Sequence, residues 1–77
     1  MKTHIQIKLF ATLQQFMPDS ADHFPIEAGT TIQSLLDQLD IPSAKAKLIF
    51  IDGIKADLNK ILNGGERVGI FPPVGGG

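Results

Sequence analysis

The sequence predicts an α+β domain in which one sheet packs against one main helix. Two observations carry this prediction. In several short segments apolar residues recur with a period of two, as they do along strands with one buried face. One other segment has leucine and isoleucine at helical spacing, which indicates a single amphipathic helix. Strands mixed with one main helix in 77 residues are typical of a small α+β domain.

The chain begins with a predicted strand followed by a short helix. Alternation over residues 4–9 predicts a strand whose apolar side chains face inward; these are Ile5, Ile7 and Leu9. Thr12 and Gln15 then fit a capping box, which begins a short helix that ends at Pro18. That helix would turn three apolar side chains inward: Leu13, Phe16 and Met17.

A second strand and the main helix follow. Residues 23–27 predict the strand, and Pro25 within it favours a place at the edge of the sheet. Thr30 and Gln33 repeat the capping-box pattern at the start of the main helix. The apolar residues behind them follow the spacing of one helix face: Ile32, Leu35, Leu36 and Leu39. Pro42 closes the helix, because the residue before a proline resists the α conformation.

The second half of the chain predicts three further strands joined by tight turns. Residues 48–51 form a continuous apolar run, and the Asp-Gly pair at 52–53 is a type I′ hairpin signal. The return strand would span residues 54–57. A second turn at residues 63–65 precedes a last strand over residues 67–71. The side chains that face inward from this last strand are Val68 and Ile70.

Composition limits the classes of function. An apolar content of 43% is enough for one small core, so a single folded domain is expected. A net charge of −1 gives no electrostatic case for nucleic acid. The chain has no cysteine, which removes disulfides and thiolate sites and favours a cytoplasmic protein. The sequence shows no signal peptide and no apolar run long enough for a membrane span, so we expect no membrane partner.

Side-chain chemistry predicts no catalytic or metal site. His4 and His23 are the two histidines, and their spacing is not that of a metal site. Two ligands would in any case not complete such a site. A hydrolase needs two carboxylates that converge in a cleft, and the acidic residues here read as loop and helix-surface charges. We therefore expect no bound metal, no bound cofactor and no catalysis by this chain alone.

The most informative segment is residues 71–77, which read Phe-Pro-Pro-Val-Gly-Gly-Gly. Glycines lack a Cβ atom and can pass through a slot too narrow for other residues, although each loses much backbone entropy when it is ordered. Pro72 and Pro73 fix two φ angles and stiffen the base of this arm in an extended conformation. The arm can therefore deliver the carboxylate of Gly77 to the active site of another protein.

The pattern Phe-Pro-Pro-Val-x-Gly-Gly resembles the C-terminus of the MoaD/ThiS family of ubiquitin-like sulfur carriers, and the double proline favours the MoaD side. Three inner segments are also similar to the family: residues 7–11, 49–53 and 62–68. Asp52 stands where asparagine is common in the family, and Asn63-Gly64 departs from its usual turn. The resemblance implies a β-grasp fold, a mixed sheet of about five strands on one main helix. It also implies a domain over residues 1–71 and an extended tail over residues 72–77.

The resemblance also implies a function. The chain is similar to the small subunit of molybdopterin synthase, which donates sulfur and has no active site of its own. An adenylating enzyme of the ubiquitin-activating type (MoeB/ThiF-like) would use ATP to adenylate Gly77, with Gly76 kept small to pass the slot. A sulfur donor enzyme would then leave a thiocarboxylate on Gly77. A MoaE-like large subunit, in a heterotetramer, would use that sulfur for the molybdenum or tungsten cofactor.

Three other functions stay open. A thiamine-type carrier, or one for another sulfur-containing metabolite, uses the same tail chemistry with another acceptor. A ubiquitin-like protein modifier would form isopeptide bonds with lysines, which detection of conjugates would reveal. A plain interaction module predicts that blocking the C-terminus has no consequence.

Two aromatic residues predict where a partner docks. Phe10 and Phe71 are out of phase with the inward residues of their strands, so they face away from the core. In a β-grasp sheet the first and last strands are parallel neighbours, which would bring both rings to one rim. We expect an exposed apolar patch there that docks a partner around the tail, unless a strand end twists and tucks one ring under a loop. The other predicted docking residues are Ile54, Pro72, Pro73 and Val74.

Overall fold

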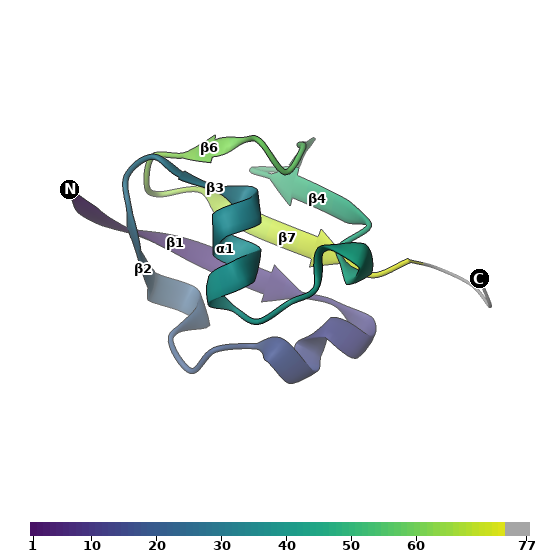
Figure 1. Cartoon of the computed structure of the whole chain (residues 1–77). Helices are drawn as coiled ribbons and strands as arrows, with labels where there is room; N and C mark the ends of the chain where they lie inside the picture. The colour runs from purple at the N-terminus through teal and green to yellow at the C-terminus, as the bar shows by residue number, and fades with distance from the viewer. Residues whose placement is uncertain (74–77) are drawn as a thin grey trace.

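The computed structural model describes residues 1–73 of the chain. They form a five-stranded sheet in the order β2-β1-β7-β4-β5, with helix α1 across one face (Figure 1). The strands of this sheet are β1 (Lys2–Leu9), β2 (Phe24–Glu27), β4 (Leu48–Ile51), β5 (Ile54–Lys55) and β7 (Arg67–Phe71). The helical segments are α1 (Ile32–Gln38) and the 3-10 turns η1 (Ala11–Phe16), η2 (Ala21–His23) and η3 (Ser43–Lys45). The predicted class, a mixed sheet with one main helix, is confirmed.

The first and last strands lie side by side in the middle of the sheet. β1 and β7 run parallel, with Ile7 opposite Val68 and Leu9 opposite Ile70. All four side chains are buried, because the period of two sends them to the face that α1 covers. β2 and β4 then flank this pair in antiparallel register. The predicted inward residues of both strands are confirmed.

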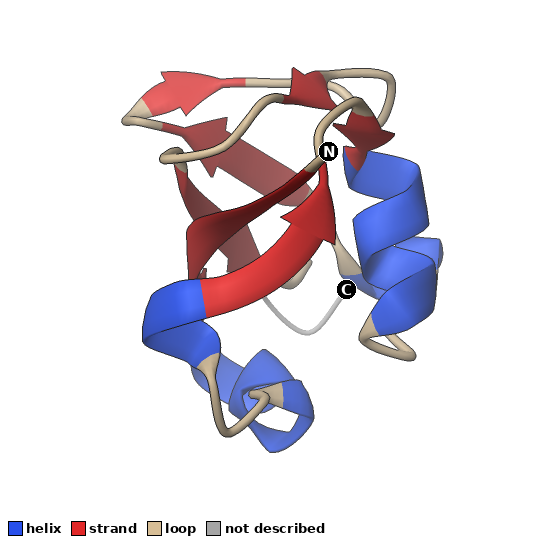
Figure 2. Ribbon diagram, turned by 90° about the vertical axis from the view of Figure 1, so that its left-hand side faces the viewer, coloured by secondary structure: helices blue, strands red, loops and turns tan. Residues whose placement is uncertain are grey.

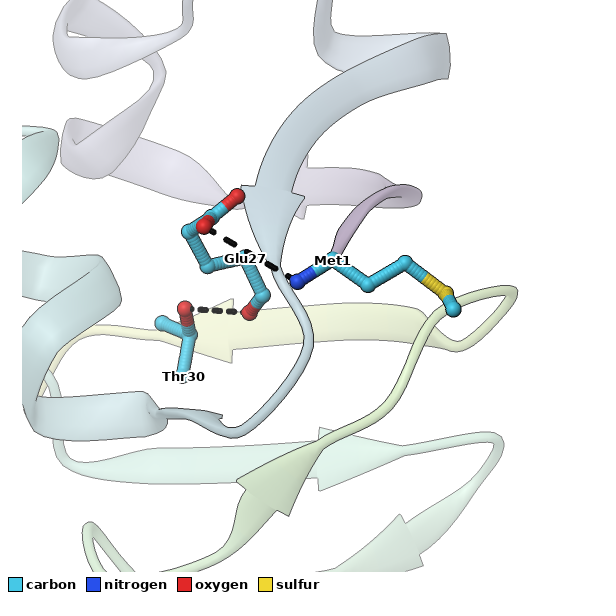
Figure 3. A network of polar contacts seen from close by, with 3 residues as sticks. All are labelled: Met1, Glu27 and Thr30. Atoms are coloured by element: carbon cyan, nitrogen blue, oxygen red, sulfur yellow. Dashed lines mark hydrogen bonds and ion pairs between the residues drawn. The ribbon is translucent and has the colours of Figure 1, made fainter.

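β2 is an edge strand, as Pro25 predicts. Among residues 1–73 it pairs with β1 alone, and Pro25 has no N–H to offer to a further strand. Beyond β2 the amino group of Met1 lies 3.9 Å from Glu27 Oε1, and Thr30 Oγ1 donates to the Glu27 carbonyl oxygen over 2.6 Å (Figure 3). The ion pair is exposed, so it adds little stability. The two contacts join the start of the chain to the turn after β2.

Helix α1 carries the predicted apolar stripe. Ile32, Leu35 and Leu36 are fully buried, and Leu39 at the C-terminal cap is 8% exposed. The predicted N-cap at Thr30 is wrong by one residue. The hydroxyl oxygen of the next residue, Thr31, accepts the N–H of Ser34 over 3.1 Å and caps the helix. Thr30 lies one residue too early, because α1 begins at Ile32, and its hydroxyl donates to the Glu27 carbonyl oxygen instead.

The segment predicted as the first helix is a 3-10 helix, which is wound more tightly than an α-helix. It is the 3-10 turn η1, which begins after Phe10 and has no side-chain cap, so the capping box at Thr12 is wrong. The turn begins at Ala11, one residue before Thr12, and Ala11 itself has a positive φ of 53°. Leu13 is buried as predicted, but Met17 is 42% exposed and does not face inward. Side chains three residues apart eclipse in a 3-10 turn, so Phe16 follows Leu13 and packs against the core as predicted, whereas Met17 at the C-cap turns away.

The β4–β5 hairpin is tied to the last strand. Asp52 and Gly53 both have positive φ angles, 53° and 83°, as a type I′ turn requires, so the predicted turn is confirmed. Asp52 Oδ1 accepts the N–H of Arg67 over 3.0 Å, and the N–H of Asp52 donates to the Arg67 carbonyl oxygen over 2.9 Å. The return strand is shorter than the predicted residues 54–57, since β5 holds only Ile54–Lys55.

A second, two-stranded sheet was not predicted. It consists of β3 (Thr30–Thr31) and β6 (Ile61–Leu62) in antiparallel register, and it leads directly into α1. Two residues are too few to show an alternating pattern, so the sequence gives no strand signal there. Leu62 is nevertheless fully buried, and β6 thus closes one end of the core.

The turn before β7 is held by Glu66 and by contact with β1. The N–H groups of Asn63 and Gly64 donate to the Glu66 carboxylate over 2.8 and 2.7 Å. Gly64 has a φ of 120°, a value that residues with a side chain rarely adopt. A Cβ atom at this position would also overlap the side chain of Thr3. Both the backbone and the contact with Thr3 therefore require glycine at this position.

Gly64→Ala is expected to lower the free energy of unfolding by about 2–4 kcal/mol, from a strained φ and an overlap with Thr3. Gly65→Ala is the matched control, because Gly65 also has a positive φ but no atom lies within 4 Å of an added Cβ. Its cost should be the backbone strain alone, about 1–2 kcal/mol. Urea unfolding measures both values, and equal losses would contradict a role for the Thr3 contact.

The sheet ends at Phe71, and Pro72 and Pro73 follow it. Figure 2 shows α1 on one side of the sheet and η1 and η2 beyond its lower end. Residues 74–77 of the predicted tail lie outside the described residues, so the division of the chain at residue 72 stays a prediction. No helix within residues 1–73 is long and apolar enough to cross a membrane.

Candidate functional site

The outer face of the sheet, opposite α1, presents the side chains that the core does not use. On β7 the side chains of Val68 and Ile70 are buried on the inner face, so Gly69 between them belongs to the outer face. The register pairs Gly69 with Lys8 of β1 on one side and with Phe50 of β4 on the other. The row formed across the outer face by Lys8, Gly69 and Phe50 therefore has no side chain at its centre.

Three phenylalanines form an aromatic cluster at the end of this face: Phe10, Phe50 and Phe71. The rings of Phe10 and Phe71 stack with centroids 4.2 Å apart and 0° between their planes. Phe50 meets Phe71 edge-on, at 5.7 Å and 87°. The predicted proximity of Phe10 and Phe71 is confirmed, and neither ring is fully buried: Phe10 is 36% exposed and Phe71 is half-buried. Stacked and edge-on pairs stabilise one another, so the cluster is preformed.

The sequence analysis did not assign a role to Phe50. A signal was present, because Ile49 and Ile51 on either side of Phe50 are buried and the period of two sends the ring outward. The strand is apolar at every position, and this uniform composition hides the alternation.

A shallow hollow of ≈ 400 Å³ lies beside the aromatic cluster on the outer face. The three rings form its apolar walls, and Gly69 lies among the residues that line it. Lys8, Asp52 and Arg67 supply its charged residues. The hollow therefore combines an apolar interior with a polar rim, the usual character of a recognition surface.

The predicted tail begins next to the aromatic cluster. Phe10, Leu48 and Phe71 line a second small hollow together with Pro72 and Pro73. Pro72 is half-buried there and Pro73 is exposed. The chain thus leaves the sheet at the rim where the docking patch is predicted. The other predicted tail residues, Val74, Gly76 and Gly77, lie outside the described residues.

Ile54 lies apart from the aromatic cluster. It is 72% exposed and pairs with Ile51, whose side chain faces the inner side of the sheet. Ile54 and the exposed Ile61 line a separate hollow at the β5 edge. A docking role for Ile54 would therefore involve a different surface from that of Phe10 and Phe71.

The two histidines lie together, which the sequence does not predict. The rings of His4 on β1 and His23 on η2 stack with centroids 3.8 Å apart and 19° between their planes. The antiparallel pairing of β1 with β2 places His4 opposite Pro25, two residues after His23. Within residues 1–73 no three metal-ligating side chains converge, and no polar or charged residue is buried.

A family model described as the ThiS family matches residues 7–77. The chain belongs to the ThiS family. This membership confirms the resemblance that the tail and the inner segments carry. It identifies the chain as a small carrier of the ThiS/MoaD type, a class that works with adenylating enzymes and does not catalyse reactions alone. No protein with a curated description matches the chain.

Solved structures confirm the ubiquitin-like β-grasp fold. The HVO 2177 protein of Haloferax volcanii is 19% identical with a TM-score of 0.76, over 99% of this chain and 88% of that one. SAMP1 from Haloferax volcanii is 22% identical with a TM-score of 0.65, over the full length of both chains. A Pyrococcus furiosus protein described as molybdopterin converting factor, subunit 1, is 23% identical with a TM-score of 0.64, over 94% and 99%. At these identities the likeness shows the fold alone.

Proposed function

We propose that this ThiS-family protein is a sulfur carrier for molybdopterin biosynthesis and the small subunit of a molybdopterin synthase. Gly77 carries the sulfur as a thiocarboxylate. The observation that supports this most is the family match, which extends through the tail to residue 77. The Pro72-Pro73 pair favours molybdopterin over thiamine as the product that receives the sulfur, and so does the likeness to the Pyrococcus furiosus protein.

Charging of Gly77 requires a partner enzyme, because a free carboxylate is an anion whose carbonyl carbon resists nucleophilic attack, which makes it a poor acyl donor. In the adenylating enzyme a carboxylate oxygen attacks the α-phosphorus of ATP, and pyrophosphate leaves. The persulfide of a sulfur donor enzyme then attacks the acyl carbon of the adenylate, and AMP leaves. A second thiol of the enzymes, since this chain has no cysteine, attacks the donor enzyme's sulfur in the acyl disulfide, so that a disulfide forms and the thiocarboxylate leaves. ATP is a substrate of the partner, and this chain itself holds no cofactor.

The outer face holds the carrier against its partners while the tail reaches their active sites. Phe10 and Phe71 offer partly exposed aromatic surface at the point where Pro72 begins the tail. A partner that covers the rings gains the burial of apolar area, and aromatic residues are common anchors of protein interfaces. The adenylating enzyme and the MoaE-like large subunit bind the carrier in turn, because one tail cannot occupy both active sites at once.

Mass spectrometry of the protein from its native host tests the proposal. The thiocarboxylate is heavier than the carboxylate by the difference between sulfur and oxygen. We expect this heavier form in the purified carrier and its loss on incubation with the large subunit and the pterin precursor. A carrier that never acquires the extra mass with adenylating enzyme, ATP and persulfide donor present would contradict the proposal.

Phe71→Ala is expected to weaken binding to the adenylating enzyme by about 2–4 kcal/mol, the usual scale for an aromatic anchor. The ring contacts both Phe10 and Phe50, so its loss also loosens the aromatic cluster. Stability should fall less than after a core truncation, because Phe71 is only half-buried. Calorimetric titration measures the affinity, with Met17→Ala as a control for an exposed apolar residue elsewhere. Equal affinities for both variants would exclude Phe71 from the interface.

A ubiquitin-like protein modifier is the second candidate. Two solved structures of similar fold are of small archaeal modifier protein 1 from Haloferax volcanii. In that role the adenylated Gly77 would form an isopeptide bond with a lysine of a target protein. Immunoblots of host lysates under reducing conditions distinguish the two roles. A ladder of conjugates that disappears when Gly77 is deleted would favour the modifier.

A further inference from the structure

The hollow on the outer face exists because one position in the middle of the sheet has no side chain. Lys8 and Phe50 flank Gly69 on the neighbouring strands. Along β7 the outward neighbours of Gly69 are Arg67 and Phe71, two residues before and after it. A side chain at position 69 would stand among these four residues and occupy the space that they surround.

Folding does not require glycine at position 69. Gly69 is not among the residues with a positive φ, so its backbone suits any residue. A Cβ atom there would find its nearest neighbour, Cε2 of Phe10, at 3.6 Å, an ordinary van der Waals distance. Gly64 is the opposite case, since a Cβ there would overlap Thr3. Glycine inside a strand weakens the strand, so the property that Gly69 supplies is the open space itself.

The walls of the hollow suit an apolar side chain. The rings of Phe10 and Phe71 are held in place by their stack, and Phe50 is held edge-on against Phe71. A guest that enters this preformed space does not have to order the walls, which reduces the entropic cost of binding. The space beside Gly69 can therefore receive a single apolar side chain.

The rim of the hollow carries an excess of positive charge. Lys8 and Arg67 are both exposed, and no ion pair engages either side chain among the residues that the structure describes. Asp52 at the same rim already accepts the backbone N–H of Arg67. Two cations against one carboxylate favour a partner surface that is negatively charged.

From these observations we propose that the hollow at Gly69 is a socket for one apolar side chain of the carrier's protein partner. Carboxylates of the partner, next to that apolar side chain, form ion pairs with Lys8 and Arg67. Gly69 then determines which partners fit, because a side chain at this position would occupy the socket while its Cβ atom overlaps no neighbour. This inference rests on the proposed function, since it describes how the same carrier docks.

The test compares Gly69→Val with the unmodified carrier, using the host's adenylating enzyme. Calorimetric titration should give a dissociation constant raised by about tenfold or more for Gly69→Val. In the adenylation assay the KM for the carrier should rise by the same factor and kcat should stay within about twofold, since only docking has changed. Gly69→Ala should show a smaller increase, because a single methyl group fills part of the socket. Thermal unfolding should show that both variants are at least as stable as the parent.

Two controls separate the socket from general effects on the outer face. Gln6→Val adds a β-branched residue on the same face outside the hollow and should leave the affinity unchanged. Lys8→Glu should weaken binding at about 50 mM salt and have less effect at about 500 mM, whereas Lys2→Glu, outside the hollow, should not. A folded Gly69→Val carrier that binds within twofold of the parent overturns the inference. If the unmodified carrier binds but is never adenylated, the proposed chemistry of Gly77 fails, and the titration still decides the socket.

Discussion

Deletion of Gly77 is expected to abolish formation of the acyl-adenylate while the free energy of unfolding stays unchanged. The reaction needs a carboxylate at the position that the adenylating enzyme presents to ATP. A chain shortened by one residue stops about 3.3–3.6 Å short, more than a reacting pair tolerates. Within the described residues the buried core lies between Ile5 and Ile70, so we expect the core to form without Gly77. Release of pyrophosphate in the presence of the enzyme and ATP measures the loss.

Matched variants of the tail distinguish two requirements: the position of the terminal carboxylate and the size of the residues that pass the slot. A tag after Gly77 should abolish adenylation as the deletion does, because the carboxylate is then displaced. Gly76→Leu should act likewise by obstructing the slot, whereas Gly75→Ala should be tolerated better, since the family resemblance allows other residues at that position. Normal adenylation of a tagged carrier would exclude the sulfur-carrier function.

The parts of the fold that the sequence predicts are those with a repeated pattern. β1 and β7 alternate cleanly over several residues, and the apolar stripe of α1 spans two turns, so both the elements and their buried faces are correct. The errors are at the starts of the helices, where a capping pattern does not fix which residue begins the helix. Thr30 and Thr31 are both threonines, and the helix begins after the second of them, while the Thr30 hydroxyl donates to the Glu27 carbonyl oxygen.

The sequence predicts the part of the candidate site in which the proximity of two side chains follows from one pair of neighbouring strands. Phe10 and Phe71 are each out of phase with the core, and parallel neighbours bring such residues to the same face. Phe50 and Gly69 join them only through the register between β4 and β7. Alternation fixes which face each side chain takes, but no single turn joins β4 to β7, so the sequence does not specify which residues of the two strands stand opposite one another.

Leu36→Ala is expected to lower the free energy of unfolding by about 2–5 kcal/mol, because the truncation leaves a cavity in a packed core. Leu36 is fully buried where α1 contributes to the core beneath the sheet. Leu39→Ala should cost less within that range, since Leu39 already contacts solvent at the end of the helix. For a small domain, whose whole stability is about 5–15 kcal/mol, the larger loss is a substantial fraction.

Chemical unfolding of Leu36→Ala beside Gln38→Ala measures this effect against a matched control on the same helix. Gln38 is exposed and forms no side-chain hydrogen bond within residues 1–73, so its replacement should change the free energy by less than about 0.5 kcal/mol. The large loss should also leave the binding affinity of the remaining folded protein unchanged, because α1 covers one face of the sheet (Figure 1) and the alternation along β4 and β7 places the aromatic cluster on the other. Similar midpoints for the two variants would show that α1 does not pack against the sheet through Leu36.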